Sequence, residues 1–316
     1  MTRPLPEAVA SAAAPSDAAP YPGWIRWPLA VLRTARPRQW PKNLLVFAAP
    51  LAGASLGRRD GLAYALVAAV AFCAASVAVY MVNDVVDADR DRRHPVKRRR
   101  PVAAGELAKA QALAVAAVCI ICALSAGFAI RTPLLSAIIG GYVASSLLYS
   151  LVLKHIPVIE LIFVASGFVL RALGGAAATH VPPSGWFLLV CSLGALLVAT
   201  AKRYTEMAVL GSDAVRHRPS MRWYRPAALR LAQRITAIAM ITAYVLWALG
   251  EHRGWIRAWH LASALPLAAT LIRFDHLTAR ATPKPVEDLL ARDTPMVLLE
   301  IVWLLTFVTG LWELVQ

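Results

Sequence analysis

The sequence predicts an all-α polytopic membrane protein with nine transmembrane helices. Hydrophobic residues make up 59% of the chain and charged residues only 16%, against about a quarter charged in an ordinary soluble domain. Apolar stretches of about 20 residues, the length that crosses a bilayer, recur between clusters of charge, proline and glycine. This composition excludes a water-soluble globule, and the same hydrophobicity excludes a disordered chain.

Nine stretches have this character. They cover residues 43–57, 61–82, 107–130, 133–152, 156–178, 185–201, 227–250, 256–272 and 295–315. The first is short, and we expect it to extend back toward Trp24. Residues 1–23 are rich in alanine and proline and lack a continuous apolar core. We therefore expect 1–23 to form a disordered cytoplasmic tail and 24–316 to form a single transmembrane domain.

The distribution of positive charge predicts the orientation, because basic loops stay on the cytoplasmic side of a membrane. Including the first residues of the stretch that follows, the segment between the second and third stretches (90–109) and the segment between the sixth and seventh (202–234) each hold eight lysines or arginines. The odd-numbered loops hold two at most. We expect a multi-pass protein of the cell membrane with its amino terminus and active site cytoplasmic and its carboxyl terminus outside. The net charge of +15 then reflects topology, and no nucleic-acid partner is expected.

An acidic cluster ends the second stretch. The sequence NDVVDADRD, residues 83–91, holds four of the chain's 18 acidic residues. At 100° per residue, Asn83, Asp84, Asp87 and Asp91 share one face of a helix, and Asp89 points away. Carboxylates and an amide on one face suit Mg²⁺, which keeps positions for water and substrate phosphate. A solvated helix end, whose acids balance the arginines that follow, remains the alternative.

A calcium loop is excluded for the same segment. Asp87, Asp89 and Asp91 have the D-x-D-x-D spacing, but Arg92 stands where the glycine is needed and Arg98 where the bidentate glutamate belongs.

Basic residues accompany the acids. Lys97 and Arg98 to Arg100 follow the cluster, where cations suit a polyphosphate ligand, although such residues also mark cytoplasmic loops. At the end of the sixth stretch Lys202, Arg203 and Glu206 share a helix face, which suits a phosphate clamp. Interfacial snorkelling explains either cation alone.

Two charges lie within the fifth stretch. Arg171 is deep in the expected helix, and a charge at that depth indicates a functional site. Glu160 has nearly the same angular position, so both should face the bundle interior, too far apart along the axis to pair with each other. An ion pair with another helix is the structural alternative for each.

A further polar motif, RPRQWPKN, precedes the first stretch. It places Arg36, Gln39, Trp40, Lys42 and Asn43 at the membrane surface. Amphipathic anchoring is the alternative to a binding role.

These features together resemble the UbiA-type superfamily of intramembrane transferases. Nine helices, NDVVDADRD at the end of the second and a basic loop after it carry the resemblance over almost the whole chain. It implies an all-helical bundle with a lipid-open central cavity for a polyprenyl chain. It also implies that Asn83, Asp84, Asp87 and Asp91 hold Mg²⁺ and a diphosphate, with the three acids as the catalytic residues.

The end of the sixth stretch departs from the usual pattern. Aromatic prenyltransferases carry a second acidic motif there, and this chain has Lys202-Arg203-Tyr-Thr-Glu206 instead. With RPRQWPKN, NDVVDADRDRRHPVKRRRPVAAGEL and ELIFVASGFVLRALGGA, the chain is similar to the actinobacterial branch that moves 5-phosphoribose from phosphoribosyl pyrophosphate to decaprenyl phosphate. That reaction begins the supply of the arabinose donor for cell-wall arabinan. The acceptor phosphate is already anionic, so no strong base is needed.

This similarity implies roles for particular residues. The donor-binding set is Asn83, Arg90, Lys97, Arg100, Tyr149, Lys202, Arg203 and Glu206. The set for the lipid phosphate is Gln39, Lys42, Glu160 and Arg171. The expected partners are phosphoribosyl pyrophosphate, a decaprenyl or other polyprenyl phosphate and the lipid bilayer, and the family allows a homo-oligomer such as a trimer.

Two other functions remain open at this stage. A prenyltransferase that moves a prenyl group from a prenyl diphosphate to an aromatic acceptor would share the fold and the first motif. A transporter or membrane scaffold would be compatible with the buried Arg171 and Glu160 alone.

Overall fold

The computed structural model describes residues 23–94, 96–153, 156–211, 219–280, 286 and 292–311. The expected tail, except Gly23, and residues 212–218 of the second basic segment lie outside these ranges. The described residues form helices and no strands. In order they are α1 (Gly23–Ala35), η1 (Pro37–Phe47), α2 (Ala48–Ala52), α3 (Gly61–Arg92), η2 (Lys97–Arg99), α4 (Pro101–Ala104), α5 (Lys109–Ala129), α6 (Pro133–Leu151), α7 (Ile159–Ala178), α8 (Gly185–Leu210), η5 (Pro219–Trp223), α10 (Pro226–Glu251), α11 (Gly254–Ala279) and α13 (Thr294–Leu311).

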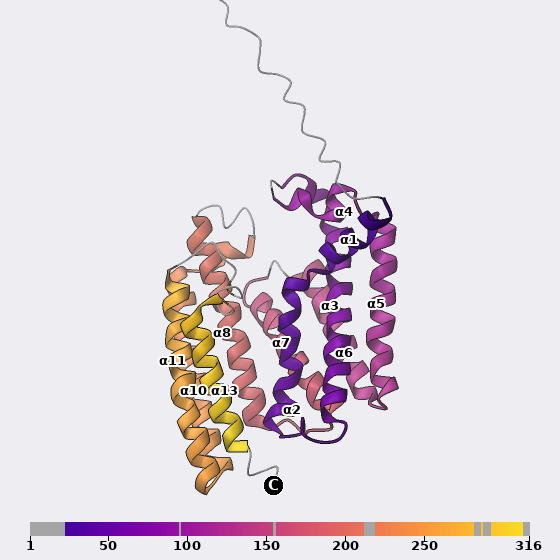
Figure 1. Cartoon of the computed structure of the whole chain (residues 1–316). Coiled ribbons are helices and arrows are strands. Elements are labelled where there is room, and N and C mark those ends of the chain that lie inside the picture. Colours follow the sequence, from indigo (N-terminus) through magenta and orange to yellow (C-terminus); the bar gives the residue numbers. More distant parts are fainter. Residues whose placement is uncertain are drawn as a thin grey trace, which may run out of the picture.

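Seven of these helices are long and apolar enough to cross a membrane, which confirms a multi-pass membrane protein. They are α3, α5, α6, α7, α8, α10 and α13. Figure 1 shows them as a bundle of roughly parallel rods, with α10, α11 and α13 together at one side. The helix α11 has 26 residues but is not among the seven.

The first expected span is not a continuous helix, contrary to the sequence prediction. Arg36 has a left-handed backbone (φ 52°) that ends α1, and η1, a 3-10 helix of 11 residues, follows. Pro37, Pro41 and Pro50 lie in this segment, and each lacks the N–H that an α-helix interior needs. A 3-10 helix rises about 2.0 Å per residue, so η1 and α2 together extend about 30 Å. In Figure 1 this segment runs from the end of the bundle beside α4 to the opposite end.

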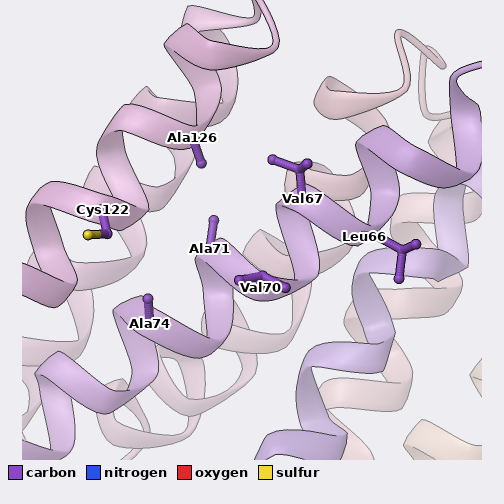
Figure 2. Close-up of a pocket in the computed structure, with 7 residues that line it drawn as sticks. All are labelled: Leu66, Val67, Val70, Ala71, Ala74, Cys122 and Ala126. Atoms are coloured by element: carbon purple, nitrogen blue, oxygen red, sulfur yellow. The ribbon is translucent and has the colours of Figure 1, made fainter.

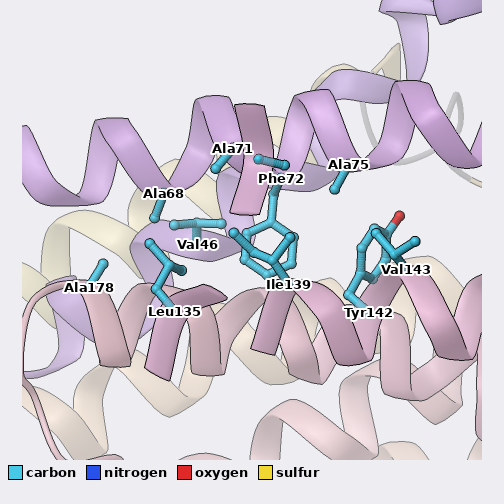
Figure 3. Close-up of a cluster of buried hydrophobic side chains, with 11 residues drawn as sticks. Val46, Ala68, Ala71, Phe72, Ala75, Leu135, Ile139, Tyr142, Val143 and Ala178 are labelled. Atoms are coloured by element: carbon cyan, nitrogen blue, oxygen red, sulfur yellow. The ribbon is translucent and has the colours of Figure 1, made fainter. Parts of the chain in front are cut away.

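Small residues allow the central helices to pack closely. One buried cluster joins Val46, Phe72, Leu135, Ile139 and several alanines of α3, as Figure 3 shows. At Gly175 a Cβ atom would lie 1.7 Å from the Val46 carbonyl oxygen. Only glycine therefore lets α7 touch η1, which is how membrane helices commonly approach each other.

An apolar groove lies between α3 and α5. It has a volume of about 320 Å³ and is lined by Leu66, Val67, Val70, Ala71, Ala74, Cys122 and Ala126 (Figure 2). Leu66 and Val70 are half-exposed or more. Its lining offers no group that holds a phosphate, so the polar chemistry must lie elsewhere.

Candidate active site

The acidic motif and the polar start of α7 lie at the same level of the bundle. Arg171 of α7 contacts Ser76 of α3, and Ala178 packs in one cluster with Ala68, so the two helices run antiparallel. Asp87 lies eleven residues beyond Ser76 on α3, and Glu160 lies eleven residues before Arg171 on α7. At about 1.5 Å per residue each lies about 16 Å from the contact, toward the same end.

The predicted acidic face is present on α3. Asp84 and Asp91 are 2% exposed, and the side chain of Asp87 is 28% exposed. The Asp89 side chain is 65% exposed and pairs with Arg92 at 2.6 Å and Lys109 at 3.3 Å. The helical spacing therefore sends three acids inward and one outward.

Two arginines neutralise the buried acids. Arg36 donates to Asp84, and its guanidinium carbon lies 5.0 Å from the centre of the Tyr80 ring. Arg100 lies 2.7 Å from Asp91 and 3.3 Å from Asp84. Burying carboxylates is costly unless such partners are present. Arg100 was predicted at this site, whereas Arg36 was expected only at the membrane surface. Its place was not visible in the sequence because the left-handed turn at Arg36 directs the chain back over α3.

The donor atoms of this face fit a hard cation such as Mg²⁺. The Oδ1 atom of Asn83 is buried without a hydrogen-bond partner, and three carboxylates follow it on the same face. Oxygen ligands of this kind are what Mg²⁺ takes. Within the described residues, no three His, Cys, Asp or Glu side chains gather closely enough to hold an ion. Asp84 and Asp91 are instead bridged by the Arg100 guanidinium.

A second polar cluster joins α7 to α8. Glu160 is fully buried, and its Oε1 atom lies 3.2 Å from Nε of Arg203. Arg203, 6% exposed, also donates to Glu206. Lys202 lies 5.9 Å from the centre of the Phe168 ring. The shared face of Lys202, Arg203 and Glu206 is present, and Glu160 has the ion pair with another helix that was the structural alternative.

Tyr224 completes this cluster and was not predicted. It follows η5, and its hydroxyl oxygen accepts the Val158 N–H at 2.8 Å. Burial, together with the neighbouring Glu160 carboxylate, raises the pKa of Tyr224. No spacing in the sequence connects two residues 66 positions apart.

Arg171 is the centre of a third polar group, deeper in the bundle. It donates to Asn43 Oδ1 at 2.7 Å, the Gly167 carbonyl at 2.6 Å, Ser76 at 3.2 Å and the Tyr142 hydroxyl at 2.8 Å. These bonds use four of the five N–H groups of a guanidinium. No carboxylate in the described part of the chain pairs with it. Arg171 faces the interior as predicted, but its hydrogen bonds go to the protein.

The remaining predicted residues lie at the same end of the bundle. Lys42 donates to Gln39 within η1. Tyr149 is half-buried near the end of α6, whereas Arg90 and Lys97 are exposed. The structure therefore brings together Arg100 and the acids, and Glu160, Arg203 and Glu206. Arg90 lies 3.7 Å from Asp87 at the exposed edge of the acidic face, whereas Lys97 joins neither cluster among the described residues.

Comparisons with known proteins found a matching family, related sequences and a related fold. The profile of the UbiA prenyltransferase family matches residues 44–290. A Mycobacterium tuberculosis protein named decaprenyl-phosphate phosphoribosyltransferase is 37% identical over 280 residues, which cover 87% of this chain and 92% of that protein. A Corynebacterium glutamicum protein of the same name is 36% identical and covers 77% and 75% of the two chains. The solved structure of a UbiA homolog from Archaeoglobus fulgidus bound to GPP and Mg²⁺ is similar, with a TM-score of 0.67 at 16% identity, covering 89% of this chain and 99% of that chain.

Proposed function

The chain belongs to the UbiA prenyltransferase family, and on that basis we propose that it transfers 5-phosphoribose from phosphoribosyl pyrophosphate to decaprenyl phosphate and releases pyrophosphate. Relatives named decaprenyl-phosphate phosphoribosyltransferase, at 33–37% identity over most of the chain, support this activity. The observation that most supports it is the pair of buried carboxylates, Asp84 and Asp91, which pair with Arg36 and Arg100. They lie at the same level of the bundle as the second cluster, in which Arg203 pairs with Glu160. The product would serve as a precursor of the arabinose donor for cell-wall arabinan.

In the proposed reaction an oxygen of the lipid phosphate attacks C1 of the ribose while the bond from C1 to pyrophosphate breaks. The configuration at C1 inverts. Asn83, Asp84, Asp87 and Asp91 would hold Mg²⁺, which neutralises charge on the departing pyrophosphate. A UbiA homolog of similar fold is bound to GPP and Mg²⁺ in its solved structure, which supports the use of a divalent metal.

The arginines on the acidic face have a second role in this proposal. With a divalent cation on the carboxylates, Arg36 and Arg100 would be free to donate to diphosphate oxygens. Guanidinium groups suit this exchange because they form paired bonds with carboxylate and phosphate alike.

The second cluster supplies the cations for the donor's 5-phosphate. We assign Lys202 and Arg203 to that contact, with Arg90, Lys97 and Tyr149 extending the phosphate-binding surface. Glu160 and Glu206 orient Arg203, because a carboxylate repels phosphate and so is a poor direct ligand.

The lipid phosphate approaches from η1. Gln39 and Lys42 are proposed to contact it, and Arg171 supports them indirectly through its bond to Asn43 of the same helix. The polyprenyl chain would lie in a cavity open to the lipid between these helices.

The proposed topology has nine crossings in one domain over residues 24–316. The seven apolar helices are joined by the η1–α2 segment and by α11. The basic segments put the amino terminus and the active site in the cytoplasm and the carboxyl terminus outside. A homo-oligomer, for example a trimer, is compatible with this topology.

Transfer of radiolabelled ribose phosphate to decaprenyl phosphate tests the proposal. Purified protein is assayed with Mg²⁺ or a chelator, and Asp87→Asn is compared with Asp89→Asn. The second variant makes the same chemical change on the exposed side of the same helix. We expect labelled lipid that requires the metal and Asp87 but not Asp89. Prenyl transfer from a prenyl diphosphate to an aromatic acid, with no labelled lipid, would replace the proposal by the aromatic prenyltransferase alternative.

A further inference from the structure

A strained residue marks the start of α7. Val158 has φ 65° and ψ −52°, a region that β-branched side chains almost never occupy because the Cβ substituents meet the backbone. Its carbonyl accepts the N–H groups of Leu161 and Ile162 at 3.0 and 3.1 Å. Val158 therefore sets where the first turn of α7 begins, and an outlier of this kind persists only where its surroundings hold it.

Besides the local bond from the Ile159 N–H to the Pro157 carbonyl at 2.8 Å, a group from a distant part of the chain holds Val158. The Val158 N–H is bonded by the Tyr224 hydroxyl at 2.8 Å, and Tyr224 lies between η5 and α10. Because the first N–H groups of a helix have no partner within it, an outside acceptor at this position stabilises the start of the helix. The residues between η5 and α10 are thereby fastened to the start of α7.

This contact adjoins the cluster of Glu160, Arg203 and Glu206 that joins α7 to α8. Glu160 lies two residues after Val158, in the first turn of α7, and its carboxylate both interacts with Tyr224 and pairs with Arg203 at 3.2 Å. A shift in the start of α7 would move the Glu160 carboxylate, and Arg203 would lose the partner that fixes its Nε. A connected series of contacts thus runs from Tyr224, before α10, through Val158 and Glu160 at the start of α7, to Arg203 of α8.

We propose that Tyr224 is a positioning residue, whose hydroxyl holds Val158 in its strained positive-φ conformation and so directs Glu160 and Arg203 toward the donor phosphate. This inference rests on the proposed function for its kinetic readout. Arg203 would contact the substrate, whereas Tyr224 acts only through the backbone of Val158 and the carboxylate of Glu160.

Three variants test this proposal. Tyr224→Phe removes the hydroxyl, Val158→Gly permits the positive-φ backbone without it, and the double variant combines the two. Tyr244→Phe is the matched control, because its hydroxyl makes a buried bond to Ser263 at 2.7 Å, between α10 and α11 and outside the cluster.

Tyr224→Phe should raise the KM for phosphoribosyl pyrophosphate about 3- to 10-fold, the effect of losing one hydrogen bond, with kcat and the KM for decaprenyl phosphate within about twofold. The double variant should return the donor KM to within about twofold of wild type, because glycine adopts positive φ freely. Tyr244→Phe should leave both KM values unchanged. A purely structural role for Tyr224 predicts instead a lower thermal midpoint, equal loss in all kinetic constants and no rescue by Val158→Gly.

Hydrogen exchange separates this inference from the proposed function. Amides of residues 158–163 should exchange faster in Tyr224→Phe and return toward wild-type rates in the double variant, whatever reaction the protein catalyses. If wild-type protein transfers no ribose phosphate but exchange behaves in this way, only the proposed function fails. If exchange and the donor KM are both unchanged in Tyr224→Phe, the positioning role is wrong.

Discussion

The hydrogen bonds of Arg171 predict that replacing its partner Asn43 alone lowers the stability of the protein more than replacing both residues. Asn43→Leu would leave the Nε–H of a buried guanidinium without its acceptor at 2.7 Å, and orphaning a charged donor costs about 2–4 kcal/mol. Arg171→Met removes the charge itself. Ser76 and Tyr142 would keep their mutual bond of 3.1 Å. The Gly167 carbonyl would lose its side-chain bond of 2.6 Å but keep the backbone N–H four residues on in the helix, so the largest loss falls on the Asn43 oxygen, at about 1–2 kcal/mol.

The double variant should therefore be more stable than Asn43→Leu, since leucine and methionine leave no orphaned charge. We expect a coupling energy of about 1–3 kcal/mol between Arg171 and Asn43. Unfolding in mixed micelles with increasing denaturing detergent measures all four proteins. Arg171→Lys tests whether the planar guanidinium is needed in addition to the positive charge, because a lysine ammonium cannot reproduce four directed bonds.

Two results would refute this reasoning. If the two changes add to within about 0.5 kcal/mol, the residues act independently. If Arg171→Met leaves stability unchanged and raises only the KM for the lipid phosphate, Arg171 is a direct phosphate ligand, as the sequence alone predicted.

Three further predictions concern the acids, their counter-ions and pH. Asp84→Asn should lower kcat about 100-fold or more, because a ligand of the metal–diphosphate site is lost; a fall below tenfold would exclude Asp84 from that site. Arg36→Gln should strengthen the binding of Mn²⁺ to donor-free protein about 3- to 10-fold, because a competing cation is removed from Asp84, and it should raise the donor KM. Paramagnetic resonance measures the Mn²⁺ binding, and weaker binding would contradict the exchange of counter-ions. Burial lowers the pKa of His252, and the neighbouring Glu251 opposes this in part. As pH falls, the unfolded chain therefore takes up a proton before the folded protein does, so thermal stability should be level above about pH 6.5 and fall below it. His252→Gln should flatten this dependence, and an unchanged slope would assign it to other groups.

Local periodicity explains what was predictable about the candidate site. The inward direction of Asp84 and Asp91 and the outward direction of Asp89 follow from 100° per residue within one helix. No other part of the molecule is needed to decide that pattern. The same holds for the seven apolar helices, since their length and composition are properties of single segments.

The breaks in the first span show where local reasoning was incomplete. Pro37, Pro41 and Pro50 were visible in the sequence, yet a continuous helix was expected there. The longer rise of a 3-10 helix lets this short, proline-rich segment extend through the bundle, which a count of residues at 1.5 Å each does not anticipate.

The sequence by itself determined the membrane fold, the seven apolar helices and the face that carries the acids. Only the tertiary structure decided which partner each buried charge meets: Arg36 with Asp84, Glu160 with Arg203, and Arg171 with the Asn43 amide. The physical reason is that buried charges must find partners wherever the packing places them. Those partners come from other helices, at separations along the chain that no periodicity encodes.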